Sequence, residues 1–447
     1  MMKERVKSFI LVILVAFSLV LAEKILVDEK LWPTGYNFFS IRTNLKKADH
    51  SLADNLTMPE RIIINTGYQS SRFEYLRKSP EFKGIYDVAS NILKTAFSKP
   101  ARNISQVMDE NWYSALTGKS IYLSYPTSYS AKNFSGLLGA GRTEATFKSF
   151  SDIVIEENGN VYINDNGTFY KIETGAQEIS VIIENVLQAD IENQSVINYS
   201  FDLNFDKEFG SQKTILAPMI PIYSDVVSAQ VVYSENPVMK DDEINQRTVN
   251  QILSAFSVNP NSMWRYTEAD GTLVFVENTG ILKISTNGIL TFTASDAGIP
   301  LSAGGSSDTY DNVSQIAQFI DTVNLSINQN AEMSITSPLT EDNAQNFTFD
   351  YNVDGIPVKY AGNSAVKVTT RNGYITEYSQ ILRRYNPQDY TGNTPLYIEA
   401  LDNIIAKYQA SMNQINIKKM FPAYIDDLSG GEKSPDWYIE IDNVLAE

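Results

Sequence analysis

The residues whose types and spacing could do chemistry are few, and each group lacks part of its motif. Ser364 and Lys367 have the Ser-x-x-Lys spacing of hydrolases in which a lysine activates a serine. That chemistry needs the pair on one helical turn, whereas the apolar and polar residues around Lys367 alternate, which predicts a strand. The companion Ser-Asp-Asn and Lys-Thr-Gly motifs are absent, so we assign no catalytic pair here.

Metal and nucleotide motifs are also incomplete. Asp202, Asn204 and Asp206 offer oxygen ligands at alternate positions, as a calcium-binding loop would. Lys207 stands where such a loop needs a glycine, so we interpret these residues as exposed and polar. A glycine cluster matches neither the dinucleotide nor the P-loop pattern and predicts a turn: Gly136, Gly139 and Gly141. We expect no cofactor and no metal site.

Composition excludes several classes of function. The 447 residues contain no cysteine, which excludes disulfides, thiol nucleophiles and thiolate metal sites. The one histidine, His50, lies in a polar stretch and cannot form a histidine cluster. A net charge of −17 repels nucleic acid, which we therefore exclude as a partner. Paired carboxylates of a hydrolase cannot be recognised by spacing, because they come from distant segments.

The N-terminal segment determines the expected compartment. Three basic residues precede a mostly apolar run of 19 residues, from Phe9 to Val27, which Glu23 and Lys24 interrupt near its end. As a helix this run would be about 28 Å long, close to the thickness of a bilayer core. Ala16 and Ser18 are small residues near its middle and are candidates for contact with a partner's span. We expect a single-pass protein of the cell membrane with a cytoplasmic N-terminus and an extracytoplasmic body.

A cleaved signal peptide is the alternative interpretation of the same segment. Val20-Leu21-Ala22 could serve as the cleavage site, which would release the chain beginning at Glu23. Both interpretations stay open at the sequence level. Residues 1–28 are therefore a membrane anchor or a signal segment.

An internal repeat with an offset of 85 residues predicts the architecture of the second half. Two stretches alternate as strands around Asn-Gly turns at Gly288 and Gly373, each typical of a β-hairpin. Each is followed by an amphipathic helix at the same offset, with the apolar faces Val313, Ile316, Ile320 and Val323, then Ile398, Leu401, Ile405 and Tyr408. We predict that each helix covers the sheet of its own unit.

The predicted fold class is α+β. Behind the N-terminal membrane helix we expect an extracytoplasmic region over residues 29–230, then two similar domains of antiparallel sheet and helix. These domains are expected at residues 231–328 and 329–447.

Several segments together resemble the YycH family, membrane-anchored accessory proteins of the WalK (YycG) sensor histidine kinase in low-GC Gram-positive bacteria. The matching segments are Lys3 to Val27, Leu31 to Pro33, Trp112 to Leu116, Ile121 to Pro126, Gly373 to Tyr378 and Pro435 to Ile439. The resemblance implies no catalysis and no catalytic residues. It implies contacts with the kinase and with a YycI-like protein, and an effect on cell-wall homeostasis.

Three functions follow as hypotheses. The first is a non-enzymatic, membrane-anchored regulator of a sensor histidine kinase, which acts through its span at residues 9–27 and its outer domains. The second is a secreted carbohydrate hydrolase with two facing carboxylates. The third is a free secreted binding module, which requires cleavage before Glu23.

Overall fold

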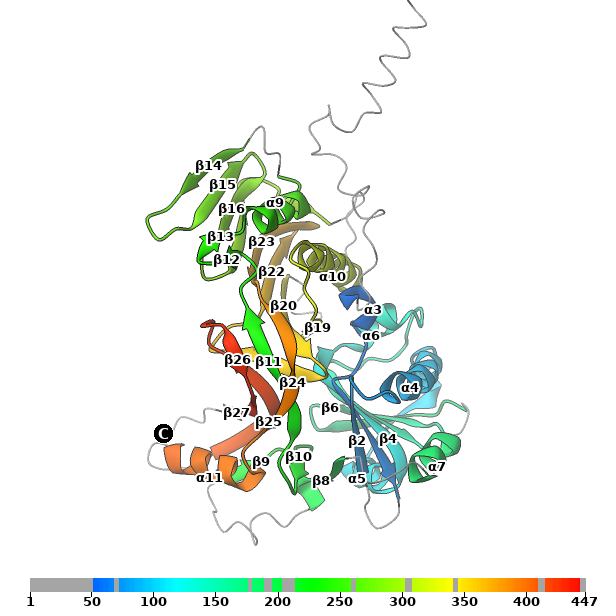
Figure 1. Cartoon of the computed structure of the whole chain (residues 1–447). Helices are drawn as coiled ribbons and strands as arrows, with labels where there is room; N and C mark the ends of the chain where they lie inside the picture. Colours follow the sequence, from blue (N-terminus) through cyan, green and yellow to red (C-terminus); the bar gives the residue numbers. More distant parts are fainter. Residues whose placement is uncertain are drawn as a thin grey trace, which may run out of the picture.

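The computed structural model describes residues 51–67, 72–175, 179–188, 195–202, 214–258, 263–301, 308–340, 345–408 and 415–442. This part is mixed α and β and rich in sheet, with eight α-helices (Figure 1). Within it, no helix is long and apolar enough to cross a bilayer. The predicted span at residues 9–27 lies outside the described residues, and so do its candidates Ala16 and Ser18. His50 lies outside them as well.

A nine-stranded sheet forms the first half of the described chain. Its spatial order is β10-β8-β2-β1-β4-β5-β6-β7-β3. The strands are β1 (Arg61–Thr66), β2 (Arg72–Leu76), β3 (Ile104–Val107), β4 (Lys119–Tyr129), β5 (Phe150–Glu156), β6 (Val161–Asp165), β7 (Thr168–Ile172), β8 (Ser195–Tyr199) and β10 (Pro221–Tyr223).

Both faces of this sheet are covered near its centre, as the apolar run in β1 requires. Alternation along the strand sends Ile62 and Ile64 into one core and Ile63 into another. The first core also contains side chains of the helices α4 (Phe82–Phe97), α6 (Ala131–Leu138) and α7 (Ser180–Gln188). The second contains Trp112 and Leu116 of α5 (Asp109–Thr117).

A larger sheet, of 13 strands, dominates the second half. Its main path is β14-β15-β16-β17-β23-β22-β20-β21-β25-β27, and β18, β19 and β9 join it at β23, β20 and β25. The strands are β9 (Thr214–Leu216), β14 (Trp264–Thr267), β15 (Leu273–Glu277), β16 (Gly280–Ile284), β17 (Ile289–Ala294), β18 (Ile299–Pro300), β19 (Glu332–Ile335), β20 (Asn346–Val353), β21 (Ile356–Tyr360), β22 (Val366–Arg371), β23 (Tyr374–Ile381), β25 (Ile415–Asp426) and β27 (Pro435–Asp442).

Smaller elements complete the described part. A three-stranded sheet joins β24 (Arg384–Asn393), β11 (Ser228–Glu235) and β26 (Gly431–Lys433), and a small hairpin joins β12 (Met239–Lys240) and β13 (Glu243–Ile244). The remaining helices are α3 (Leu52–Asn55), α9 (Gln246–Ala255), α10 (Thr309–Ser326) and α11 (Tyr397–Tyr408).

The two predicted hairpins are present, with the predicted glycine geometry. β16 pairs with β17 and β22 with β23, and Gly288 and Gly373 have φ angles of 80° and 78°. Asn372 also has a positive φ, 53°, which matches a type I′ turn in the second hairpin. The first hairpin closes with a longer loop, because the backbone N–H of Ser285 bonds to the carbonyl of Ile289.

The two hairpins lie side by side in one sheet, which the sequence did not predict. β17 pairs antiparallel with β23, with Phe292 opposite Tyr378 and Thr293 opposite Glu377. With the offset of 85, position 292 of the first unit corresponds to 377 of the second, and 293 corresponds to 378. The two facing pairs, 292 with 378 and 293 with 377, are therefore equivalent to each other. The hairpins are therefore related by an approximate two-fold axis and belong to one continuous sheet. The domain boundaries at residues 28, 230 and 328 stay a prediction.

The two helices of the repeat pack on different surfaces, which corrects the sequence-based expectation. α10 buries its predicted face in the first core, where Phe319 packs on Tyr378 of β23 at 5.3 Å between ring centroids. α11 instead belongs to the second core, where Tyr397 packs on Trp437 of β27 at 5.2 Å. The reason is that β25 and β27, which follow α11, offer it a different apolar surface.

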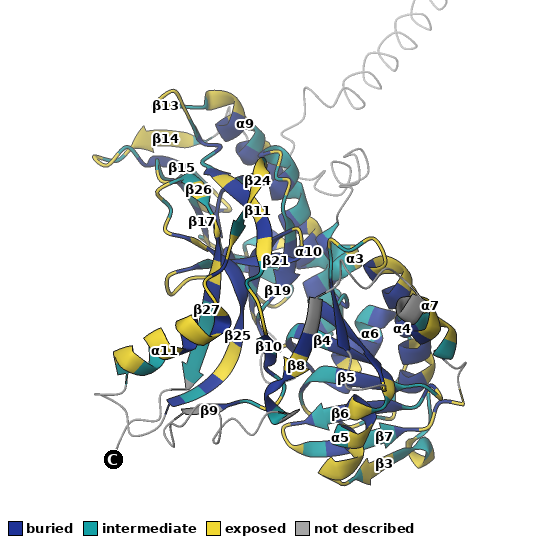
Figure 2. Cartoon of the chain, turned by 60° about the horizontal axis from the view of Figure 1, so that its bottom comes forward, coloured by how far each residue is buried: buried dark blue, intermediate teal, exposed yellow. Residues whose placement is uncertain are grey.

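The buried face of α11 agrees with the predicted one at three of four positions. Leu401 is buried, and Ile405 and Tyr408 pack partly buried against the second core, whereas Ile398 is 36% exposed. Tyr397 and Ala400 are the other buried residues of the helix. Much of α11 is exposed in Figure 2, whereas β4 of the first sheet is mostly buried. Amphipathic spacing therefore located this helix but not its partner.

Candidate functional site

A polar row crosses the otherwise apolar centre of the first sheet. Arg61 and Asn65 on β1 share a face with Ile63, since strand residues alternate, and Glu74 lies opposite Ile63 on β2. Arg61 and Glu74 are 8% and 9% exposed. Charged residues are rarely buried without a partner, so this row needs an explanation.

Tyr223 completes the arrangement from the edge strand β10. Its hydroxyl donates to both carboxylate oxygens of Glu74 at 2.9 Å, and Arg61 Nη1 lies 3.5 Å from Glu74 Oε1. Tyr223 is itself buried, 8% exposed. These three side chains, Arg61, Glu74 and Tyr223, are called the buried triad below.

Burial and charge shift the ionisation of the buried triad. Burial raises the pKa of Glu74 above its ordinary value of 4.5, and the attraction of Arg61 and the hydrogen bond from Tyr223 oppose this only in part. Burial alone would lower the pKa of Arg61, but the charges of Tyr223 and Glu74 outweigh it and raise that pKa. Arg61 therefore stays charged, while Glu74 takes up a proton more readily than an exposed glutamate.

A cavity of about 510 Å³ adjoins the buried triad. Its walls come from β1, β2 and β10 of the first sheet and from β21 and β25 of the second. A second cavity, of about 340 Å³, shares Glu60, Arg61 and Phe421 with the first. Phe421 of β25 lines both cavities and therefore lies between them.

Hydrolase chemistry finds little support in this cavity. A glycosidase needs two facing carboxyl groups, about 5–9.5 Å apart, of which one acts as acid and the other as base or nucleophile. Glu60 and Glu74 both line the cavity, but Tyr223 and Arg61 hold Glu74 in place. No observation among the described residues favours the hydrolase hypothesis, which stays a prediction.

The structure does not gather the other sequence candidates. Lys367 lies in β22 and donates to Asn363 Oδ1 at 3.2 Å, and Ser364 precedes the strand. Gly139 ends α6 in the left-handed conformation, φ 70°, as a turn requires. Asp202 ends a short 3-10 helix, and residues 203–213 lie outside the described part. No group of three acidic or histidine side chains in the described ranges is placed to hold a metal ion.

The sequence analysis missed the buried triad. Tyr223 is 149 residues away from Glu74 along the chain, so spacing gives no sign of their contact. One local signal existed, since Arg61 and Glu74 flank or interrupt apolar strands, Arg61-Ile-Ile-Ile and Arg72-Phe-Glu-Tyr-Leu. A charge inside a strand with two buried faces demands a buried partner.

Comparison with known proteins shows that the chain has a known fold. No protein-family model matches the sequence, and no curated protein matches it. The crystal structure of YycH from Bacillus subtilis superposes with a TM-score of 0.60 over 89% of this chain and 97% of that one, at 13% identity. The chain has a YycH-like fold. An uncharacterised protein from Eubacterium rectale matches 53% of this chain at 13% identity, with a TM-score of 0.33.

The YycH-like fold confirms the resemblance stated from the sequence at the level of architecture. At 13% identity the match concerns the path of the chain and not its side chains. A likeness at this level of identity shows the fold and does not show the partners, the localisation or the nature of the N-terminal segment.

Proposed function

We propose that this protein is a non-enzymatic, membrane-anchored extracytoplasmic regulator of a sensor histidine kinase of the WalK (YycG) type, with a role in cell-wall homeostasis. The observation that carries the proposal is the YycH-like fold over 89% of the chain. As a helix, the mostly apolar run at residues 9–27 would be long enough to serve as the anchor. The proposed partners are the kinase and a YycI-like protein.

The mechanism follows from what a single span can do. A span changes a partner's equilibrium only if it packs differently against the partner's two states. Ala16 and Ser18 are small and would let a neighbouring helix approach closely. In a helix, residues two apart point about 200° away from each other, so these two test opposite faces. The outer body would add contacts with the extracytoplasmic parts of the same partners.

Ala16→Leu and Ser18→Leu test the proposed packing separately. We expect one of them to change the phosphorylation of the cognate response regulator in cells, at unchanged protein level, because the larger side chain blocks close approach. Ile13→Leu, which nearly conserves volume, is the matched control and should leave the output unchanged. Normal output from both leucine variants contradicts packing through the middle of this span.

The anchor is tested by itself. N-terminal sequencing of the protein recovered from cells should show an uncleaved start, and the protein should stay with the membrane fraction after a high-salt wash. A mature N-terminus at Glu23 in the soluble fraction would support the free binding module instead.

A further inference from the structure

The cavity beside the buried triad has the size and lining of a ligand site. Its volume of about 510 Å³ falls within the range of small-molecule pockets, about 300–1,000 Å³. Tyr75, Pro357 and Phe421 give it an apolar wall, and Arg61 gives it a buried cation. Four further charged side chains line the rest of the cavity: Glu60, Glu74, Lys78 and Glu81. Polar groups that converge beside an apolar wall can orient a small molecule.

Arg61 has hydrogen-bonding capacity that the described residues do not use. Its Nε is buried and has no hydrogen-bond partner among them. Its Nη1 is 3.5 Å from Glu74 Oε1, longer than the ~2.7–2.9 Å of a charge-assisted hydrogen bond. The guanidinium is therefore incompletely paired, and an acceptor that reaches its cavity-lining edge would gain from binding Arg61.

Tyr223 explains why Glu74 does not accept more hydrogen bonds from the Arg61 guanidinium. Both carboxylate oxygens of Glu74 accept hydrogen bonds from the Tyr223 hydroxyl. The carboxylate is therefore oriented toward the phenol and does not form a two-pronged pair with Arg61. The guanidinium keeps donors for a second oxyanion.

We propose that this cavity binds a small monocarboxylate with an apolar body. Its carboxylate pairs with the guanidinium of Arg61, which lines the cavity, and its apolar part lies against Tyr75, Pro357 and Phe421. Glu60, Glu74 and Glu81 line the same cavity with Lys78, and their repulsion disfavours a multiply charged anion more strongly than a singly charged one. Because two sheets form the walls, a bound acid would fasten them together. The site goes beyond the proposed function, since it does not depend on the kinase.

Thermal unfolding of the full chain in detergent micelles tests the site with named probes. The probes are acetate, phenylacetate and N-acetylphenylalanine, each compared with its neutral amide at equal ionic strength and pH. Phenylacetate and N-acetylphenylalanine should raise the midpoint of unfolding, and the amides and acetate should raise it less or not at all. A ligand that binds the folded state stabilises it by mass action. Equal shifts for acids and amides, or no shift with any aromatic acid, overturn the proposal.

Two matched tryptophan variants locate the effect. Ser79 is half-buried on the cavity wall, so Ser79→Trp should fill the cavity and abolish the shift with phenylacetate. Thr95 is exposed on α4, so Thr95→Trp adds the same ring outside the cavity and should keep the shift. A shift that survives Ser79→Trp assigns the acid to another site and overturns the proposal. Both variants leave the buried triad intact, which limits the risk of misfolding.

Discussion

At the residue scale, Glu74 links stability to pH. Its raised pKa means that the folded state holds a proton more tightly than the unfolded state does. The contribution of Glu74 is therefore most favourable below about pH 4.5 and is lost as the pH rises through the raised pKa. We expect the difference in free energy of unfolding, wild type minus Glu74→Gln, to decrease as the pH rises from about 4.5 through the raised pKa of Glu74. Urea unfolding at a series of pH values measures it, and a relative free energy that rises with pH contradicts the assignment.

Two tryptophans give a matched pair of substitutions at the same scale. Trp112 is 1% exposed and packs on Phe169 at 5.7 Å, whereas Trp264 is 80% exposed on the edge strand β14. Trp112→Ala should lower the free energy of unfolding by about 3–5 kcal/mol, because it leaves a cavity. Trp264→Ala should change it by less than about 0.5 kcal/mol. Urea unfolding followed by far-UV circular dichroism measures both, and similar losses would contradict the described burial.

At the element scale, the hairpin turns differ in how much space surrounds their glycines. Gly167 and Gly288 both have positive φ, 86° and 80°. A Cβ at Gly167 would meet nothing within 4 Å, but one at Gly288 would clash with Arg383 Nη1. Gly167→Ala should therefore cost about 1–2 kcal/mol of backbone strain, and Gly288→Ala clearly more. Denaturant unfolding of both variants compares the losses, and equal losses would show that Arg383 moves aside freely.

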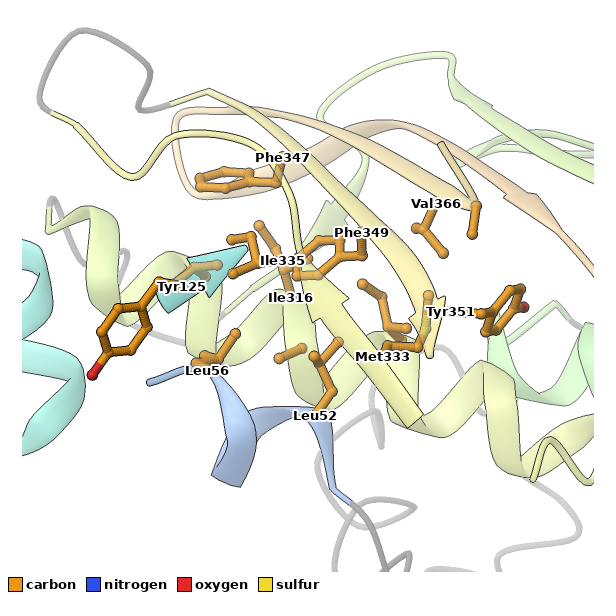
Figure 3. Close-up of a cluster of buried hydrophobic side chains, with 14 of the residues drawn as sticks. Leu52, Leu56, Tyr125, Ile316, Met333, Ile335, Phe347, Phe349, Tyr351 and Val366 are labelled. Atoms are coloured by element: carbon orange, nitrogen blue, oxygen red, sulfur yellow. The ribbon is translucent and has the colours of Figure 1, made fainter. Parts of the chain in front are cut away.

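At the scale of the whole molecule, the two large sheets share one core. The backbone N–H of Leu339 donates to the carbonyl of Ser128 at 2.8 Å, and Asn133 Nδ2 donates to the carbonyl of Leu339 at 2.7 Å. Asp321 of α10 accepts from the backbone N–H of Leu52 at the start of α3, at 3.0 Å. Figure 3 shows Leu52 of α3 and Leu56, which follows the helix, beside side chains of the later sheet.

This shared core predicts coupled unfolding. Phe134→Ala, next to the first sheet, and Phe347→Ala, in the second, should each lower the midpoint of the same transition, because both side chains belong to one buried cluster. Val181→Ala, at a position that is 64% exposed, is the control. Thermal unfolding followed by both far-UV circular dichroism and tryptophan fluorescence measures this. Two separate transitions, each moved by one variant, would contradict a single cooperative core.

The local elements of the second half could be predicted because their causes are local. The Asn-Gly turns at Gly288 and Gly373 and the buried face of α10 follow from backbone sterics and helical period. The partner of α11 could not be predicted, because amphipathic spacing specifies an apolar face and not the surface that covers it. The pairing of β17 with β23 is likewise a contact between segments far apart in the chain.

By itself, the sequence determined the α+β class, the hairpins, the positions of the repeat helices and the resemblance to YycH, since these depend on residue type, period and order. Only the tertiary structure decided that the two repeat units share one sheet and that Tyr223 meets Glu74 beside Arg61. The physical reason is that a buried charge needs a partner from any part of the chain that reaches it. Spacing along the sequence holds no record of which segment that is.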